Sequence, residues 1–209
     1  MRSTQFNSKY LIAKILSYVL HPAIVPVVFA LLFFSINAPL FDRVQKIYIL
    51  MSIIVGTYFL PITIALLFYK LNILKSLEMH NRQERKAPYI IAAVFYYLTA
   101  LALKLVPAAQ LLHLFLMATS IVILVLLAQI PFYKASAHVA SFAGLLAAII
   151  VLSRMYNLSP LVLTLAIAAT GIIAWARLEV EAHTSAEVFA GFLSGFTPIF
   201  VLFYLFAFK

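Results

Sequence analysis

The chain has 209 residues, of which 66% are hydrophobic and 10% are charged, and its formal net charge is +9. Soluble domains are usually about one-quarter charged, so this composition excludes a soluble domain with a single anchor and predicts one integral membrane domain over residues 1–209. The 15 Lys and Arg residues are scattered among the expected helix ends and form no basic face, which excludes a nucleic-acid-binding protein. The absence of cysteine excludes disulfides and thiolate chemistry.

Apolar runs recur along the whole chain, and a membrane-crossing helix needs about 20 such residues. We therefore predict an all-α polytopic bundle with seven apolar segments, or six if one is re-entrant or interfacial. The first is broken at His21-Pro22, residues 10–20 are candidates for an interfacial position, and Pro61 is expected to kink the second. The expected segments are Ile15–Ile36, Ile47–Tyr69, Tyr89–Val106, Ala108–Ile130, Ala137–Ser153, Pro160–Ala176 and Ser185–Phe208.

Three polar stretches, residues 70–88, 131–138 and 177–184, are each separated from the next by two apolar segments. Two crossings return the chain to the side where it started, so all three are expected at helix ends on one membrane face. That face carries ten Lys and Arg residues against five on the other, which favours the cytoplasm by the positive-inside rule. Without the four basic residues that are candidates for substrate binding, the count is six against five and favours neither face.

The polar stretches contain the residue types that phosphoryl transfer requires. A phosphate site needs clustered cations for the oxygens, a nucleophile, and an acid for the leaving oxygen. The last stretch leads into Glu187 and supplies Arg177 and His183; a helix would place His183 and Glu187 on one face because they are four residues apart. Ionisable residues at the ends of membrane helices are functional candidates by default. The other stretches contribute Lys75, Arg82, Lys134, Ser136 and His138.

These residues resemble the three motifs of the type 2 phosphatidic acid phosphatase superfamily, in the same order. Lys75 and Arg82 are separated by six residues, as in the first motif. Residues 136–138, Ser-Ala-His, resemble the Ser-Gly-His core of the second motif. Residues 177–187 have the Arg, His and acidic-residue spacing of the third, with Glu in place of Asp. The whole chain is similar to a group of short bacterial membrane proteins assigned to this superfamily.

The resemblance implies a role for each matching residue. His183 would be the nucleophile that becomes phosphohistidine, Glu187 would orient its ring, and His138 would be the general acid. The family needs no metal and no other cofactor. The phosphate oxygens would be held by Arg177, Arg82, Lys75, Ser136 and Lys134.

The chain departs from the family pattern beside these motifs: Gln83 replaces proline, Ala135 and Ala137 replace proline and glycine, Ala176 replaces serine, and Glu187 replaces aspartate. Arg85 and Lys86 lie close to Arg82, so either could take the place of Lys75. Lys134 equally suits a basic loop on the cytoplasmic side.

Some of these residues also suit purely structural roles, such as helix capping or packing. Ser136 is a favourable helix N-cap, and His138 suits an interfacial position. The glycine pair at 191–195 predicts close helix packing. His21 and His113 lie in apolar runs away from the motifs, so we interpret both as packing or interfacial residues.

We predict a multi-pass membrane phosphatase that hydrolyses a terminal phosphate of a phospholipid or isoprenyl (pyro)phosphate arriving from the bilayer. The resemblance implies the bacterial inner membrane, with the site facing outward. The alternative is a non-catalytic binder or transporter of phosphorylated lipids that uses the same cationic pocket. The expected partners are this substrate and membrane lipids, and the sequence leaves the oligomeric state open.

Overall fold

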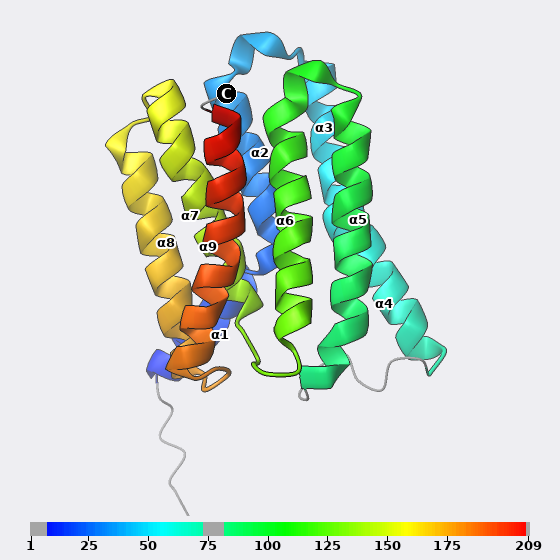
Figure 1. The fold of residues 1–209 in the computed structure, drawn as a ribbon, viewed down its shortest axis with the longest axis vertical. Coiled ribbons are helices and arrows are strands. Elements are labelled where there is room, and N and C mark those ends of the chain that lie inside the picture. Colours follow the sequence, from blue (N-terminus) through cyan, green and yellow to red (C-terminus); the bar gives the residue numbers. More distant parts are fainter. Residues whose placement is uncertain (1–7, 73–81, 208–209) are drawn as a thin grey trace, which may run out of the picture.

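The computed structural model describes residues 8–72 and 82–207, and within these ranges the chain is helical and contains no strand. Figure 1 shows the helices as an upright bundle, which confirms the predicted all-α architecture. The elements are α1 Ser8–Val19, η1 Pro22–Ile24, α2 Val25–Ile36, η2 Ala38–Leu40, α3 Arg43–Ile54, η3 Val55–Phe59, α4 Leu60–Lys70, η4 Arg82–Arg85, α5 Lys86–Lys104, η5 Pro107–Ala109, α6 Gln110–Gln129, α7 Ala137–Tyr156, α8 Pro160–Glu179 and α9 Ser185–Ala207.

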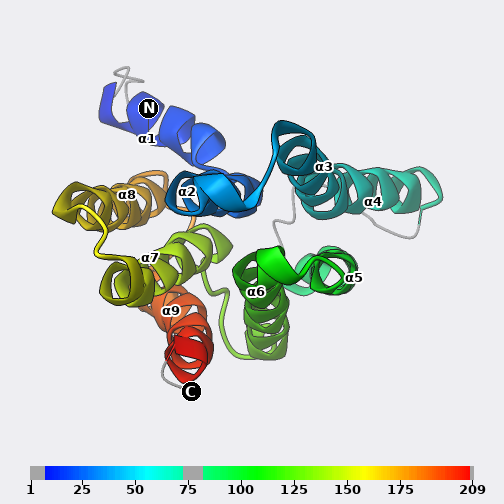
Figure 2. The same cartoon turned by 90° about the horizontal axis from the view of Figure 1, so that it is seen from above.

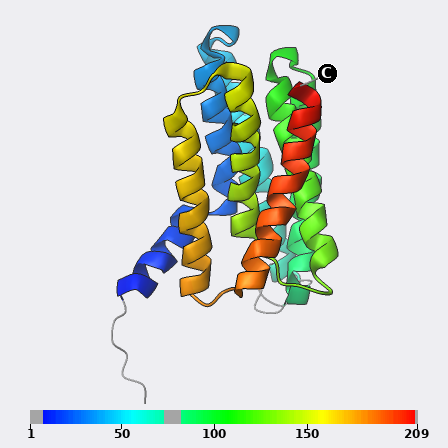
Figure 3. The same cartoon turned by 60° about the vertical axis from the view of Figure 1, so that its left-hand side comes forward.

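Seven helical segments of the described ranges are long and apolar enough to cross a membrane, as the sequence predicts. The first comprises α1, η1 and α2, and the second comprises α3, η3 and α4. Within the first, the helix is interrupted at His21, just before Pro22. Proline removes a backbone donor and clashes with the preceding turn, so α1 leaves the bundle at an angle and packs against α8 (Figure 3).

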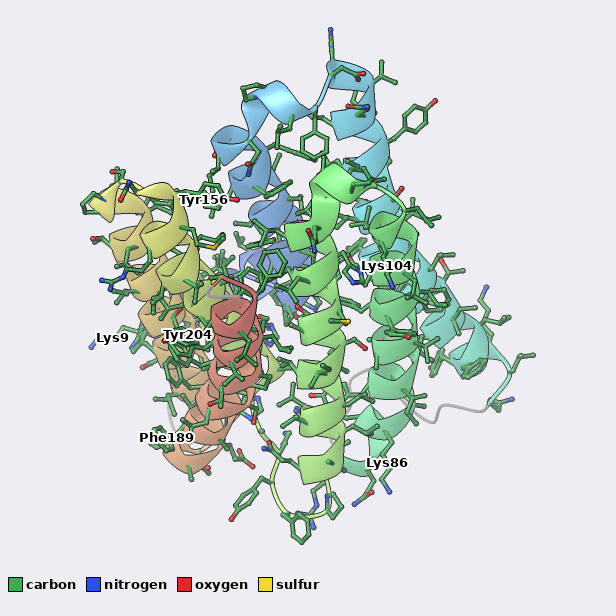
Figure 4. All side chains as sticks on the ribbon, turned by 45° about the horizontal axis from the view of Figure 1, so that its top comes forward. Lys9, Lys86, Lys104, Tyr156, Phe189 and Tyr204 are labelled. Carbon is green, nitrogen blue, oxygen red and sulfur yellow. The ribbon has the colours of Figure 1, made fainter. Side chains whose placement is uncertain are left out.

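The three polar stretches meet at one end of the bundle, which we call the polar end. Figure 1 shows the α6–α7 connection, the α8–α9 connection and the start of α5 at this lower end. Lys86 and Phe189 lie toward the polar end, and Lys104 and Tyr156 lie toward the opposite end (Figure 4). The prediction that these stretches share one face is confirmed for their described residues.

Small residues allow α7 and α9 to pack closely near the polar end. A Cβ atom on Gly195 would collide with the carbonyl oxygen of Ala140, and one on Gly191 would lie 2.5 Å from that of Ser136. This confirms the packing role predicted for the two glycines. Figure 2 shows α7 surrounded by α2, α8 and α9, so this contact fixes the start of an interior helix.

Aromatic rings connect the remaining core helices. Phe29 of α2 stacks on Phe115 of α6 with a centroid distance of 3.9 Å, and both rings meet Phe203 of α9 edge-on. All three side chains are buried. Such pairs contribute about 0.5–1.5 kcal/mol each beyond their buried area, so they hold α2, α6 and α9 in register.

A π-helical turn, η3, interrupts the second membrane segment immediately before Pro61, the proline predicted to kink this segment. Single π turns are rare and often occur at functional sites. Thr57 and Tyr58 of this turn line the wall of a partly open cavity. Gly56 in the same turn faces Thr99 of α5 at a distance that leaves no room for a Cβ atom.

Candidate functional site

A cavity of about 520 Å³ lies in the half of the bundle next to the polar end. Its walls come from η1, α2, η3, α4, α5, α6 and α7, with single residues from α8, α9 and their connection. Most lining side chains are apolar. The cavity is nevertheless lined by five histidine and arginine residues, His21, Arg85, His138, Arg177 and His183.

His183 lies in the α8–α9 connection, and a backbone carbonyl fixes its ring. The left-handed conformation of Glu181 (φ 51°) ends α8, and the N–H of Ala182 donates to the Arg177 carbonyl at 3.2 Å. This turn directs the chain back toward α7, where His183 Nδ1 lies 2.8 Å from the carbonyl oxygen of Lys134. A carbonyl can only accept, so Nδ1 carries the proton and Nε2 of the neutral ring keeps a lone pair.

Glu187 contacts His183, but not through the predicted helical face, because α9 begins only at Ser185. Instead, Glu187 forms a capping box with Thr184: the Thr184 Oγ1 accepts from the Glu187 N–H at 3.3 Å, and the Glu187 Oε2 accepts from the Thr184 N–H at 3.0 Å. The same Oε2 lies 3.5 Å from His183 Nδ1. Glu187 is therefore a secondary partner of the imidazole, after the Lys134 carbonyl.

His183 is buried, with 7% of its surface exposed. Burial lowers its pKa to about 4, with further lowering from the charges of Arg85 and Arg177, whereas the Lys134 carbonyl and Glu187 oppose the shift. The 3.5 Å contact with Glu187 resembles an ion pair, but burial and two arginines outweigh one carboxylate, so the imidazole is neutral at pH 7. A neutral ring with a free Nε2 lone pair is the state that a nucleophile requires.

This assignment predicts the titration of His183. An unfolded histidine titrates near pH 6.5, so between about pH 4 and 6.5 the unfolded chain binds more protons than the folded protein. The contribution of His183 to stability is therefore complete above this window and is lost as the pH falls through it. In ¹⁵N NMR spectra of histidine-labelled protein, assigned with His183→Asn, we expect the Nδ1-protonated neutral ring down to about pH 5. A titration midpoint at 6.5 or above would contradict the assignment.

His138 lies in the first turn of α7, and a carbonyl of α1 fixes its ring in the same way. Its Nε2 lies 3.1 Å from the carbonyl oxygen of Ser17, so Nε2 carries the proton and donates to that oxygen. When the ring is protonated, Nδ1 carries a second, transferable proton while Nε2 stays bound. This arrangement suits a general acid, whose ring must keep its position as it loses a proton.

Arg177 supplies a donor without a protein partner. It lies in the last turn of α8 and lines the cavity, and its Nε is buried without a hydrogen bond to any residue in the described ranges. Burying an unsatisfied donor costs free energy, more so when it is charged. An anion in the cavity would satisfy this donor with the charge and geometry that a guanidinium prefers.

The first motif enters the cavity through Arg85 and not through Arg82. Arg82 is exposed, and its Nη1 donates to the carbonyl oxygen of Phe132 at 3.2 Å, so it ties η4 to the α6–α7 connection. Arg85 follows one turn later and lines the cavity, and its Nη1 lies 3.5 Å from the carbonyl oxygen of Ala135. The sequence allowed Arg85 as a replacement for Lys75 with Arg82 retained, whereas the structure brings Arg85 to the cavity and directs Arg82 to the Phe132 carbonyl.

Ser136 and Lys134 lie beside the cavity. Ser136 is fully buried, and its Oγ accepts from the Val139 N–H at 3.5 Å, so it caps α7 and does not line the cavity. The carbonyl of Lys134 orients His183, and burial, followed by the charge of Arg85, lowers the pKa of its half-buried ammonium group. Lys75 lies outside the described residues.

No family model, curated protein or solved structure matches the chain. The function must therefore be inferred from the arrangement of the side chains. The structure brings His183, His138 and Arg177 to one cavity, and the spacing of the motifs anticipates all three. In the described part of the chain, no group of three or more His, Cys, Asp or Glu residues is placed to hold a metal ion.

The sequence analysis interpreted His21 as a packing or interfacial residue away from the motifs and did not place it at the cavity. The structure places its ring against that of His138, with a centroid distance of 5.5 Å and nearly perpendicular planes, and His21 lines the same cavity. A signal existed, because an ionisable residue within a membrane segment is a functional candidate by default. By contrast, His113 Nδ1 lies 2.7 Å from the Ala100 carbonyl, as a packing role predicts.

Proposed function

We propose that this protein is a membrane phosphatase that removes a terminal phosphate from a phosphorylated lipid through a phosphohistidine intermediate. The observation that carries the proposal is the cavity itself, where two arginines and three histidines adjoin an apolar compartment. The buried Nε of Arg177, which has no hydrogen-bond partner among the described residues, supports an anionic ligand, and the neutral ring of His183 supports nucleophilic attack on phosphorus. The spacings of the second and third motifs agree with this chemistry.

In the first step, the Nε2 lone pair of His183 attacks phosphorus, and the bond from phosphorus to the lipid oxygen breaks with its electron pair on that oxygen. For this step His138 must be protonated in the substrate complex; its Nδ1 proton then passes to this oxygen and releases the lipid alcohol, while Nε2 stays bound to the Ser17 carbonyl. In the second step, water attacks the phosphohistidine, the neutral His138 accepts the water proton, and inorganic phosphate leaves His183. Arg85 and Arg177 neutralise the phosphate oxygens in both steps.

The apolar walls support a substrate with a hydrocarbon chain. Val25, Ile62, Val122, Leu126 and Ile199 line the cavity together with the basic side chains. A hydrocarbon chain already in the bilayer or a micelle gains little by entering these walls, but it concentrates the phosphate beside the cavity, so long-chain phosphates should be better substrates than soluble ones. Phospholipids such as phosphatidic acid and isoprenyl (pyro)phosphates both have the required anionic head and apolar chain.

Arg85 and Arg82 provide a matched pair of variants. Because Arg85 lines the cavity and Arg82 donates to Phe132, Arg85→Ala should lower kcat/KM by about 10²-fold, whereas Arg82→Ala should lower it only a few-fold. The measurement is phosphate release from a saturating and a limiting concentration of the best lipid phosphate. A larger loss for Arg82→Ala than for Arg85→Ala would show that the first motif is assigned incorrectly.

The proposed function is tested with purified protein in detergent and a panel of phosphatidic acid, phosphatidylglycerol phosphate, isoprenyl pyrophosphate and a soluble phosphomonoester, without added metal. We expect phosphate release from at least one long-chain substrate and little from the soluble one. Binding of lipid phosphates without any phosphate release would replace the proposal with the alternative, a binder or transporter of phosphorylated lipids.

A further inference from the structure

The three histidines of the cavity are tethered to the backbone in two different ways. Carbonyl oxygens accept a hydrogen bond from His183 Nδ1 and His138 Nε2, so in each neutral ring the other nitrogen carries a lone pair. His21 is tethered in the opposite sense. Its Nδ1 accepts a hydrogen bond from the Ala23 N–H at 3.3 Å, which makes His21 the N-cap of η1.

This difference decides which ring presents a proton. An Nδ1 that accepts from a backbone N–H has no proton of its own, so the neutral His21 ring carries its proton on Nε2. Within the described ranges, no residue is hydrogen-bonded to this nitrogen. Of the three cavity histidines, His21 alone therefore offers a free N–H as a neutral ring. Enzymes use a neutral imidazole held this way as an electrophile.

We infer that His21 is a further substrate-binding residue, whose Nε2–H donates a hydrogen bond to an oxygen of the bound phosphate. The ring contacts His138 edge-on and lines the same cavity as Arg177 and His183. The interruption between α1 and α2 thus has a chemical purpose, since it allows an N-cap side chain to face the cavity. This inference rests on the proposed anionic ligand, and it assigns no proton transfer to His21.

The test separates the capping role of His21 from phosphate binding. His21→Asn keeps a good N-cap acceptor for the Ala23 N–H but lacks the ring. His21→Gln carries its amide N–H donor one methylene farther from the backbone than Asn does, nearer the position of the Nε2–H. His113→Asn is the matched control, because His113 binds the Ala100 carbonyl and does not line the cavity. The probe is a long-chain alkylphosphonate, which cannot be hydrolysed, and the readouts are its Kd and the thermal unfolding midpoint.

We expect His21→Asn to weaken phosphonate binding by about 10- to 100-fold, the range for a hydrogen bond to a charged group, with an unchanged unfolding midpoint. His21→Gln should recover part of the affinity, and His113→Asn should bind like the wild type. Equal affinities of His21→Asn and the wild type would overturn the inference, as would a wild type that does not bind the phosphonate. A wild type that binds the phosphonate but releases no phosphate from lipids refutes the proposed hydrolysis alone.

Discussion

His183→Asn is expected to abolish phosphate release, with a loss in kcat of at least about 10³-fold, because it removes the nucleophile. Asparagine is the most informative replacement. Its amide nitrogen can take the place of Nδ1 and donate to the Lys134 carbonyl, which the histidine contacts at 2.8 Å. The α8–α9 connection is therefore retained while Nε2 is lost. Phosphate release is measured by single-turnover and steady-state assays on the best lipid of the panel.

The control for this variant is lipid-phosphonate binding, which should stay within a few-fold of the wild type because Arg85 and Arg177 remain. His113→Asn provides a second control and should retain full activity, since this ring lies outside the cavity. If His183→Asn kept more than about one-tenth of the wild-type kcat, the nucleophile would have to be another residue.

Gly195→Ala is expected to destabilise the protein by about 3 kcal/mol, the upper end of the usual cost of overpacking. The added Cβ would collide with the backbone carbonyl of Ala140, and backbone cannot rotate out of the way as a flexible side chain could. α9 must therefore move away from α7. Because Ser136 and the Glu187 carbonyl are hydrogen-bonded across the same contact, at 3.1 Å, the site should lose order as well.

Gly171→Ala is the matched control for this prediction. Gly171 lies in α8, and a Cβ atom at this position would meet nothing within 4 Å. Alanine is also the better helix former, so this variant should be neutral or slightly stabilising. The measurement is the thermal unfolding midpoint in detergent for both variants. Equal midpoints would mean that α7 and α9 do not pack through Gly195.

The fold was predictable because membrane segments are defined by composition and length. Apolar runs of about 20 residues locate the helices, and the side on which each polar stretch emerges follows from the number of crossings alone. The departure of α1 from the bundle was less predictable. The sequence shows the break at His21-Pro22, but the contact of α1 with α8 depends on packing between segments more than one hundred residues apart.

The residues that line the cavity were predictable where they belong to motifs with short spacing. His183 and His138 line the cavity together with Arg177, as the motifs predict. The choice of Arg85 over Arg82 was not predictable, since both lie in the short helix just before α5, three residues apart. The helical period does not separate them, because Arg82, Arg85 and Tyr89 follow an i, i+3, i+7 pattern; the hydrogen bond from Arg82 to the Phe132 carbonyl does.

The hydrogen bonds from the histidine rings to backbone carbonyls could not be predicted from the sequence. The sequence assigned the orientation of the His183 ring to Glu187, four residues away, yet the nearest acceptor is the carbonyl of Lys134. Every residue has a carbonyl, so no residue type marks this contact. The same holds for the Ser17 carbonyl that fixes His138. The position of His21 at the cavity was not predicted, because neither its cap on Ala23 nor its contact with His138 belongs to a motif.

The most direct test of the account is to trap the covalent intermediate with a ³²P-labelled lipid phosphate. Wild-type protein, mixed with the best substrate of the panel and quenched in alkali, should carry ³²P on a peptide containing His183. This label should be stable in alkali and lost in acid, as expected for phosphohistidine, and absent from His183→Asn. Release of phosphate by the wild type with no protein-bound ³²P, or with the label on a residue other than His183, would contradict the account.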